Sequence, residues 1–273
     1  MEHKTPIYDY HSHSNISPDG TVPMDEMVRA AAEKGIRELA ITDHAEPGYP
    51  LQVLVGMDDI DEYNELLTET AERWNKEDSP ILVIKGVEIG LQVGLPNEKA
   101  RKIVEDYDYD FVIGSIHSAY KYEIDRDEYL RPRSQYQSVF DYYEAMIACL
   151  DEYDDFDVLG HINNIDRYLN EMPPESLFMD FTETVLKKLI SMGKGIEINT
   201  SSYRKGMGDR TVPTFSALKL YKEFGGEIIT IGCDAHRPSD IGAYWYDGLE
   251  MLKAAGFSAI TTFKKRKPLF IDV

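Results

Sequence analysis

The chain alternates from end to end between short apolar runs and longer stretches with helical periodicity. Met24, Met27 and Ala31 recur at spacings of three and four, and Gly35 follows them. Such spacing places side chains on one face of a helix, and glycine is frequent just past a helix end. Continuous apolar runs of strand length lie between the helical stretches. This alternation favours an α/β fold with a parallel sheet.

The same reasoning places the other elements. Strands are expected at 7–13, 39–42, 81–89, 111–116, 158–160, 195–200 and 227–231. Helices are expected from Pro23 to Gly35, at about 57–75, 97–105, 138–150, after Pro174 to about Gly193, and at 214–224. A last helix at 247–255 precedes two short strands at 259–263 and 269–271. Seven strand–helix units indicate a barrel, and an open doubly wound sheet is the alternative that counting leaves open.

Two segments break the rhythm. Residues 118–137 are rich in Tyr, Arg and Asp without a clear period, and residues 201–213 form a second loop. Long loops inside compact domains are usually functional. With no low-complexity linker and no internal repeat, residues 1–273 are expected to form one domain.

Composition excludes several classes of protein. The hydrophobic fraction of 42% can fill a sizeable core, yet no apolar run reaches the length of about 18 residues that a membrane helix needs. Residues 1–6 lack the basic segment and the long apolar run of a signal peptide. A cytoplasmic protein without a membrane partner is expected.

The charge balance bears on the partner. Lysine and arginine number 29 against 49 acidic residues, which gives a net charge of −20. Such a surface repels nucleic acid, so no nucleic-acid partner is expected. The expected ligand is a small molecule captured by local positive charge.

Six of the seven histidines lie at or just after the ends of expected strands, together with carboxylates. In chain order these residues are His11, His13, Asp19, His44, Glu88, His117, His161, Asp234 and His236. The C-terminal ends of parallel barrel strands open on one face, so these side chains should converge. One histidine at a strand end is commonly a hydrogen-bonded core residue. Six at comparable positions indicate a metal cluster.

Nine nitrogen and oxygen ligands are too many for one ion. A four- or five-coordinate metal takes three or four protein ligands, which suggests two or three ions here. Without thiolate ligands, Zn, Mn and Fe(II) all remain possible. Paired metals can clamp both oxygens of a displacement at phosphorus. Divalent ions facing only three carboxylates would leave a positive pocket that attracts a phosphate.

Short motifs surround these residues. They read Asp9-Tyr10-His11-Ser12-His13, Thr42-Asp43-His44, Gly86-Val87-Glu88, Gly114-Ser115-Ile116-His117, Gly160-His161 and Gly232-Cys233-Asp234-Ala235-His236. In this order they resemble the motifs of the PHP (polymerase and histidinol phosphatase) family of metal-dependent phosphoesterases. The resemblance covers essentially the whole chain. It implies a distorted (β/α)7 TIM-like barrel with a trinuclear metal centre.

The resemblance also implies a ligand set. The first metal would take His11, His13, Glu88 and Asp234; the second would share Glu88 and add His117 and His161; the third would take Asp19, His44 and His236. Every position of the set is filled. This completeness implies an active hydrolase and not a degenerate, non-catalytic member.

Within the family, the size and layout are most similar to the stand-alone histidinol-phosphate phosphatases. Residues 160–168 and 197–206 look similar to that branch. The resemblance implies hydrolysis of L-histidinol phosphate in histidine biosynthesis, by attack of a metal-bridging hydroxide on phosphorus. The alternatives are a phosphoesterase for another small ester, a nucleotide or phosphotyrosine, a nuclease, and a non-enzymatic metal-binding module.

Three further roles are predicted. Arg204 and Arg167 each follow a strand that ends at the site, and arginine suits bidentate recognition of phosphate. Asp19 or His236 is the expected proton donor for the leaving group. Asp43 adjoins His44, so it either supports that ligand or serves as a turn residue.

Overall fold

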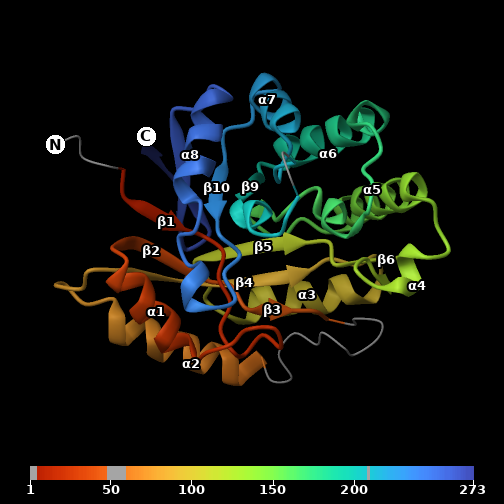
Figure 1. The fold of residues 1–273 in the computed structure, drawn as a ribbon. Helices are drawn as coiled ribbons and strands as arrows, with labels where there is room; N and C mark the ends of the chain where they lie inside the picture. Colours follow the sequence, from red (N-terminus) through yellow and green to blue (C-terminus); the bar gives the residue numbers. More distant parts are fainter. Residues whose placement is uncertain (1–4, 48–59, 208–209) are drawn as a thin grey trace.

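Seven parallel strands form the centre of the computed structural model, which describes residues 5–47, 60–207 and 210–273 (Figure 1). Their order is β1 (Ile7–Asp9), β2 (Ile36–Ile41), β4 (Leu82–Gly90), β5 (Phe111–Ser115), β8 (Val158–Leu159), β9 (Gly195–Asn199) and β10 (Ile229–Gly232). Each strand pairs in parallel with the next one in this order. The two-residue strand β3 (His44–Ala45) also pairs with β4.

The two ends of this path meet. The Tyr10 amide donates to the Ile231 carbonyl oxygen over 3.0 Å, and the His13 amide donates to the Ala235 carbonyl oxygen over 2.8 Å. Ser12 and Ala235 form a parallel bridge. The sheet is therefore a nearly closed barrel, which confirms the (β/α)7 expectation and excludes the open doubly wound sheet.

Helices cover the outside of the barrel (Figure 1). They are α1 (Met24–Glu33), α2 (Ile60–Trp74), α3 (Leu95–Asp106), α5 (Gln135–Glu152), α6 (Met179–Ser191), α7 (Phe215–Glu223) and α8 (Trp245–Ala254). Hydroxyl groups fix two of their starts, because Ser134 accepts the Gln137 amide and Thr214 accepts the Ala217 amide. None of the described helices is long and apolar enough to cross a membrane.

A separate apolar cluster fills the barrel at the N-terminal ends of its strands. It consists of Tyr10, Ala40, Ile84, Phe111, Ile113, Val158 and Phe263. Phe263 comes from the C-terminal hairpin of β11 (Ala259–Lys264) and β12 (Lys267–Asp272), and its ring lies 5.0 Å from that of Phe111. Burying such a ring contributes about 1.5–3 kcal/mol. Because this apolar cluster fills the interior at the N-terminal ends of the strands, polar side chains can gather inside the barrel at the C-terminal ends.

The first strand is shorter than the expected 7–13. The Asp9 carboxylate accepts the amides of Cys233, at 2.9 Å, and Gly242, at 3.0 Å. These bonds tie the end of β1 to the segment after β10, while the Ser12 carbonyl oxygen still accepts the Thr42 amide on the β2 side over 2.8 Å. Residues 10–13 then pair with Ile231 and Ala235, so they close the barrel instead of lengthening β1.

The sequence patterns also miss several short elements. They are β3, the hairpin of β6 (Ser118–Ala119) and β7 (Tyr122–Glu123), α4 (Asp127–Leu130), and the 3₁₀ turns η1 (Asn164–Tyr168), η2 (Glu175–Leu177), η3 (Thr200–Tyr203) and η4 (Pro238–Asp240). Elements of two to five residues are too short to show a period. The expected start of the second helix at 57–59 lies outside the described residues, and α2 begins at Ile60.

Candidate metal centre

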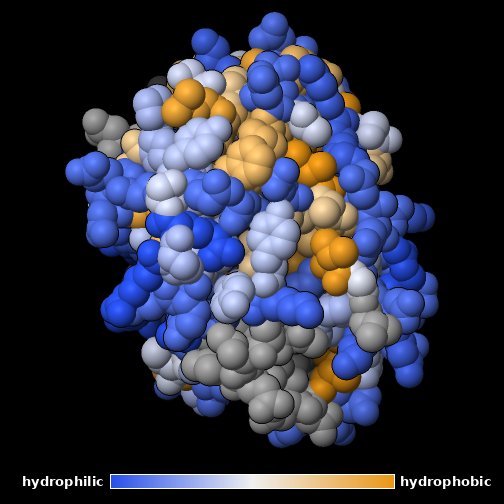
Figure 2. All heavy atoms as spheres, turned by 90° about the vertical axis from the view of Figure 1, so that its right-hand side faces the viewer, coloured by the Kyte–Doolittle hydropathy of each residue, from blue (hydrophilic) through white to orange (hydrophobic). Residues whose placement is uncertain are grey.

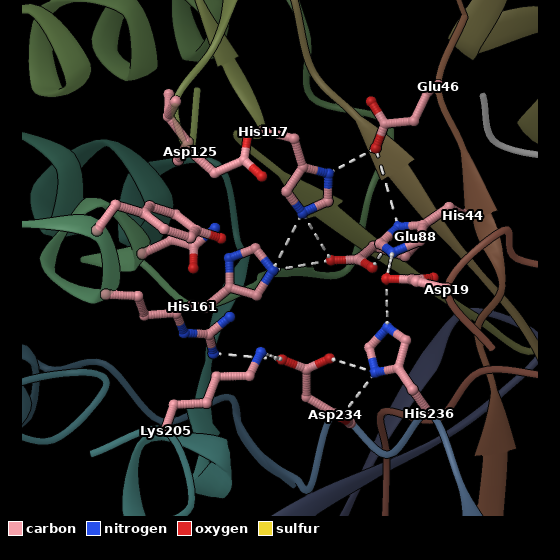
Figure 3. Close-up of a pocket in the computed structure, with 14 residues that line it drawn as sticks. Asp19, His44, Glu46, Glu88, His117, Asp125, His161, Lys205, Asp234 and His236 are labelled. Carbon is pink, nitrogen blue, oxygen red and sulfur yellow. Dashed lines mark hydrogen bonds and ion pairs between the residues drawn. The ribbon is translucent and has the colours of Figure 1, made fainter. Parts of the chain in front are cut away.

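Glu88 occupies the middle of a histidine cluster at the C-terminal end of the barrel. It lies on β4, and its side chain is fully buried. Its Oε1 lies 2.9 Å from His161 Nε2 and 3.4 Å from His117 Nε2; its Oε2 lies 2.9 Å from His44 Nδ1, 3.2 Å from His11 Nε2 and 3.5 Å from His13 Nε2. Figure 3 shows His44, His117 and His161 converging on this carboxylate. One carboxylate contacting five imidazoles suits a shared metal ligand better than an ordinary ion pair.

Two aspartates complete the cluster. Asp234 Oδ1 lies 3.5 Å from His236 Nδ1 and 3.7 Å from His13 Nε2. Asp19 Oδ2 lies 2.9 Å from His236 Nε2 and 3.8 Å from His44 Nε2. All nine residues proposed as ligands from the sequence are therefore gathered in one place.

The contacts bring members of each expected group together, but they also join different groups, as His13 with His44 and His236, and His11 with Glu88 and His161. His11, His13 and Asp234 can present ligand atoms to one ion, and Glu88 Oε2 adjoins both histidines. Glu88 Oε1 reaches His117 and His161, while Asp19 reaches His44 and His236. Which ion each side chain binds stays a prediction.

The chemistry of the cluster fits bound metal ions. The Nε2 atoms of His11 and His13 and the Oε2 of Glu88 are buried without a hydrogen-bond partner. A buried polar atom left in this way costs about 1–3 kcal/mol. A divalent cation would satisfy all three atoms at once, because neutral imidazole and carboxylate are its usual nitrogen and oxygen ligands. The buried clusters thus suit a centre of more than one metal.

The pKa values show how strongly these groups interact. Burial alone would raise the pKa of Glu88, but His11, His44 and His117 hold it well below its usual range. Burial would lower the pKa of His117, yet Glu46 and Glu88 raise it to about 9. Burial lowers the pKa of His161 to about 4, although Glu88 opposes this. The pKa values of these two neighbouring imidazoles are thus shifted in opposite directions, as expected where burial and nearby carboxylates compete.

Two of the proposed ligands have an unfavourable backbone conformation. His161 has a φ of 24° and Asp234 a φ of 52°. Positive φ is uncommon outside glycine and persists only where the surroundings enforce it. Here the His161 amide donates to Glu197 Oε2 over 2.9 Å, and Arg204 Nη2 donates to the Asp234 carbonyl oxygen over 3.1 Å. The fold thus enforces strained geometry at ligand positions, where strain is typical of functional sites.

Sequence reasoning missed two carboxylates that bind the histidines. Glu46 Oε1 lies 2.5 Å from His117 Nδ1, and Glu197 Oε1 lies 2.6 Å from His11 Nδ1. Metal-binding histidines commonly donate their second ring nitrogen to such a carboxylate, which fixes the tautomer. A two-residue spacing on the strand pattern was the available signal, since Glu46 follows His44 and Glu197 precedes Asn199 at that distance.

Glycine at position 232 makes the contact between His11 and Glu197 possible. A Cβ at this position would lie 2.3 Å from Glu197 Oε1 and 2.5 Å from His11 Cβ. Both distances are far shorter than real contacts. The Gly232-Cys233-Asp234 motif thus needs its glycine for space beside the ligands.

The two arginines have different positions. Arg167 lines the pocket beside the cluster, where its Nη2 donates to Ser201 Oγ over 2.6 Å and lies 3.2 Å from Asp234 Oδ2. Arg204 is not among the lining residues. Its guanidinium donates to the carbonyl oxygens of Cys233, at 2.8 Å, and Asp234. Arg204 therefore supports the loop that carries Asp234. Of the two arginines expected to bind phosphate, Arg167 is the one for which that role stays a prediction.

Asp43 supports the ligands from behind. Its carboxylate accepts the Ser14 amide at 2.7 Å and the Ser17 hydroxyl at 2.7 Å. The Ser17 Oγ lies 3.2 Å from His13 Nδ1 and accepts the His44 amide at 3.0 Å. Of the two roles considered for Asp43, the structure shows support of the ligand loop.

The cluster forms one side of an open pocket with a cavity volume of about 100 Å³. Its other side carries residues that the sequence did not single out, among them Asp125, Asn164, Tyr168 and Lys205. Figure 2 views the molecule from the end toward which the strands of Figure 1 point, and most of that face is hydrophilic.

The comparison with known proteins agrees with this geometry. The PHP domain model matches residues 9–201, which is more than half of the chain. The chain belongs to the PHP family. Together with the buried histidine and carboxylate clusters, the match makes it a PHP-family metal-dependent phosphoesterase.

Relatives of this PHP protein match over nearly full length. The "probable histidinol-phosphatase" of Clostridium acetobutylicum is 30% identical over 265 residues, covering 95% of this chain and 98% of that one. The histidinol-phosphatase of Lactococcus lactis is 26% identical over 267 residues, covering 95% of each chain. A solved L. lactis structure, histidinol phosphate phosphatase complexed with Zn, L-histidinol and phosphate, superposes with a TM-score of 0.85 at 22% identity, covering 96% and 98% of the two chains. This likeness shows the shared fold.

Proposed function

We propose that this PHP-family phosphoesterase is a histidinol-phosphatase, which hydrolyses L-histidinol phosphate to L-histidinol and phosphate. One observation carries the proposal: the eight other residues of the proposed nine-ligand set gather around Glu88 in a chain that matches histidinol-phosphatases over 95% of its length. The L. lactis histidinol phosphate phosphatase, which shares this fold, is complexed with Zn, L-histidinol and phosphate. That complex supports the proposal of the same substrate here.

The proposed centre holds three divalent ions, with Zn, Mn or Fe as candidates. His11, His13, Glu88, Asp234, His117, His161, Asp19, His44 and His236 would hold them. When bound, such ions polarise phosphoryl oxygens and lower the pKa of water to about 7. The protein's own part is to fix these side chains, and Glu197, Glu46 and Asp43 do this through the contacts described above.

Arg167 is the proposed phosphate-binding residue. Its guanidinium faces the pocket and is fixed by Ser201 Oγ and by Asn199 Oδ1, which accepts at 3.0 Å. Phosphoryl transfer depends mainly on positioning and on stabilising negative charge, so a fixed guanidinium beside the metals suits the task. Its pair with Asp234 at 3.2 Å places the guanidinium next to a proposed metal ligand.

Asp19 or His236 is the proposed proton donor. Burial would raise the pKa of Asp19, but His236 and His44 hold it well below its usual range, so this carboxylate stays ionised at neutral pH and His236 is the better donor of the two. They form a close pair at 2.9 Å, and the Asp19 side chain is 40% exposed at the rim of the pocket. A leaving alkoxide needs a proton, which a positioned acid supplies. The pair lies where a leaving group could depart into solvent.

A panel assay tests this function. The protein, purified and loaded with Zn, Mn or Fe, is assayed for phosphate release from L-histidinol phosphate, nucleotides, sugar phosphates and a phosphotyrosine peptide. We expect kcat/KM for L-histidinol phosphate to exceed every other value by at least about tenfold, the discrimination that about 1.4 kcal/mol provides.

Another PHP phosphoesterase activity would give a different ranking in the same panel. A nucleotide, sugar phosphate or phosphotyrosine peptide at the top would replace the proposal. Rescue of a histidine-requiring strain that lacks its histidinol phosphatase is the matching test in cells. Failure of rescue by a protein that is expressed and metal-loaded would count against histidinol phosphate as the substrate.

A further inference from the structure

The pocket has a second wall that faces the metal cluster. Among the described residues, five carboxylates line the pocket, and four of them contact histidines: Asp19, Glu46, Glu88 and Asp234. Asp125 is the fifth, and within the described part of the chain it has no ion pair with a histidine. Asp125 is therefore placed to bind something other than a metal.

The irregular segment after β5 brings Asp125 to this position. The β6–β7 hairpin folds back so that the Ile124 amide donates to the His117 carbonyl oxygen over 3.1 Å. Figure 3 shows Asp125 beside His117 on the pocket side. Arg126 lies 3.5 Å from Asp125, but its Nε donates to the fully buried Glu123 over 2.6 Å. Glu123 is the nearer partner of Arg126, and Asp125, 29% exposed, retains a face toward the pocket.

The same wall holds an unused acceptor. Asn164 lines the pocket and is 2% exposed, yet its Oδ1 has no hydrogen-bond partner. A buried amide oxygen without a partner is costly unless a ligand supplies a donor. Tyr168 lies on this wall as well. The wall therefore offers a carboxylate, an amide oxygen and an aromatic ring.

The opposite end of the wall is cationic. Lys205 and Arg167 line it, with Lys205 Nζ at 3.5 Å and Arg167 Nη2 at 3.2 Å from Asp234 Oδ2. Figure 3 places Lys205 beside Asp234, across the pocket from Asp125. A ligand that spans this wall would bind through an anionic group at one end and a hydrogen-bond-donating cation at the other.

We propose that Asp125, with Asn164 as a second acceptor, binds a protonated nitrogen of the substrate and so selects phosphate esters that carry a cationic group. The inference rests on the proposed function and deepens it. L-Histidinol carries a primary amine that is protonated at neutral pH and an imidazole with an N–H donor. A sugar phosphate offers hydroxyl groups alone and brings no cation to Asp125.

Product inhibition isolates this contact from the chemical step. L-Histidinol and inorganic phosphate are each tested as inhibitors of p-nitrophenyl phosphate hydrolysis by the metal-loaded protein. In Asp125→Asn we expect Ki for L-histidinol to rise by about tenfold or more, the usual effect of losing a hydrogen bond to a charged group. We expect Ki for phosphate to change by less than about threefold, because its contacts lie at the other end of the wall.

Two further variants sharpen the test. Asp127→Asn is the matched control, since Asp127 is 60% exposed in the same segment and pairs with Arg131. Its Ki for L-histidinol should match that of the unaltered protein. Asp125→Glu keeps the charge and should restore part of the affinity. If Asp125→Asn turns over too slowly for inhibition, calorimetric titration of L-histidinol gives the same comparison.

The outcomes separate this inference from the function on which it rests. An equal Ki for L-histidinol in Asp125→Asn and the unaltered protein overturns the role of Asp125 and leaves the histidinol-phosphatase proposal standing. An equal rise in both Ki values points to a general disturbance of the pocket and also overturns it. If L-histidinol phosphate is not hydrolysed and L-histidinol does not inhibit, both proposals fall.

Discussion

Replacing Glu88 by Gln is expected to lower kcat on any phosphate monoester by at least about a thousandfold. The Glu88 carboxylate contacts five histidines, so the amide removes a charge and a ligand from the centre of the cluster. Metal ions contribute several kcal/mol of charge stabilisation, and each 1.36 kcal/mol corresponds to about tenfold in rate. Loss of the shared ligand should therefore remove most of the catalysis.

Rates and metal content of the Glu88→Gln protein are measured together, after loading under the conditions used for the unaltered protein. Glu38→Gln is the matched control, because Glu38 lies on β2 and pairs with Leu82, six residues before Glu88 on β4. That control should keep its rate within about twofold, as expected for a site far from the chemistry. A Glu88→Gln protein with near-normal kcat would remove Glu88 from the centre.

Removing the metals is expected to abolish activity and to lower the melting temperature by roughly 10–20 °C. Two sites filled at a hundredfold excess over Kd add about 2.7 kcal/mol each, and each kcal/mol shifts Tm by about 2–4 °C in a domain of this size. Without metal, the unpartnered atoms of His11, His13 and Glu88 remain buried. The apoprotein should therefore fold but be less stable.

Thermal unfolding is followed by circular dichroism for the chelated protein, the protein as purified and the reloaded protein. The far-ultraviolet spectrum of the chelated protein serves as the control for a retained fold, because the barrel closes through a backbone hydrogen bond between Tyr10 and Ile231. Activity and Tm should both return on addition of Zn, Mn or Fe. Equal Tm values for chelated and reloaded protein would argue against ions bound inside the cluster.

The barrel could be predicted from the sequence because its signals are local. Each long strand and each amphipathic helix shows its own period, and the ends of the strands carried the histidines. Convergence of those ends then required only the rule that parallel barrel strands open on one face. The closure between residues 10–13 and Ile231–Ala235 confirms that inference.

The direction in which the side chains of the site point could not be predicted from the sequence. Arg204 and Arg167 both follow strands that end at the site, yet Arg167 enters the pocket while Arg204 turns back to two carbonyl oxygens. Both arginines belong to or adjoin 3₁₀ turns, η1 and η3, whose geometry depends on contacts distant in sequence. No period in the chain distinguishes the two cases.

Some acidic residues of the site were not predicted, for a related reason. Glu46, Glu197 and Asp125 occur in a chain with 49 acidic residues, most of which carry no chemistry. Glu197 can be recognised as pointing into the barrel only once β9 is known to face His11. Asp125 reaches the pocket because it follows a hairpin of two-residue strands. Their roles depend on tertiary contacts that composition and period do not encode.

The most direct test of the metal centre is anomalous diffraction from crystals of the metal-loaded protein, collected on both sides of the absorption edge of the loaded metal. The account predicts two or three strong peaks within coordination distance, about 2.0–2.2 Å, of the nitrogen and oxygen atoms of His11, Glu88, His161 and their neighbours. It predicts that Glu88 contacts more than one of them. Crystals that contain the metal but show no peak beside Glu88 would contradict the account.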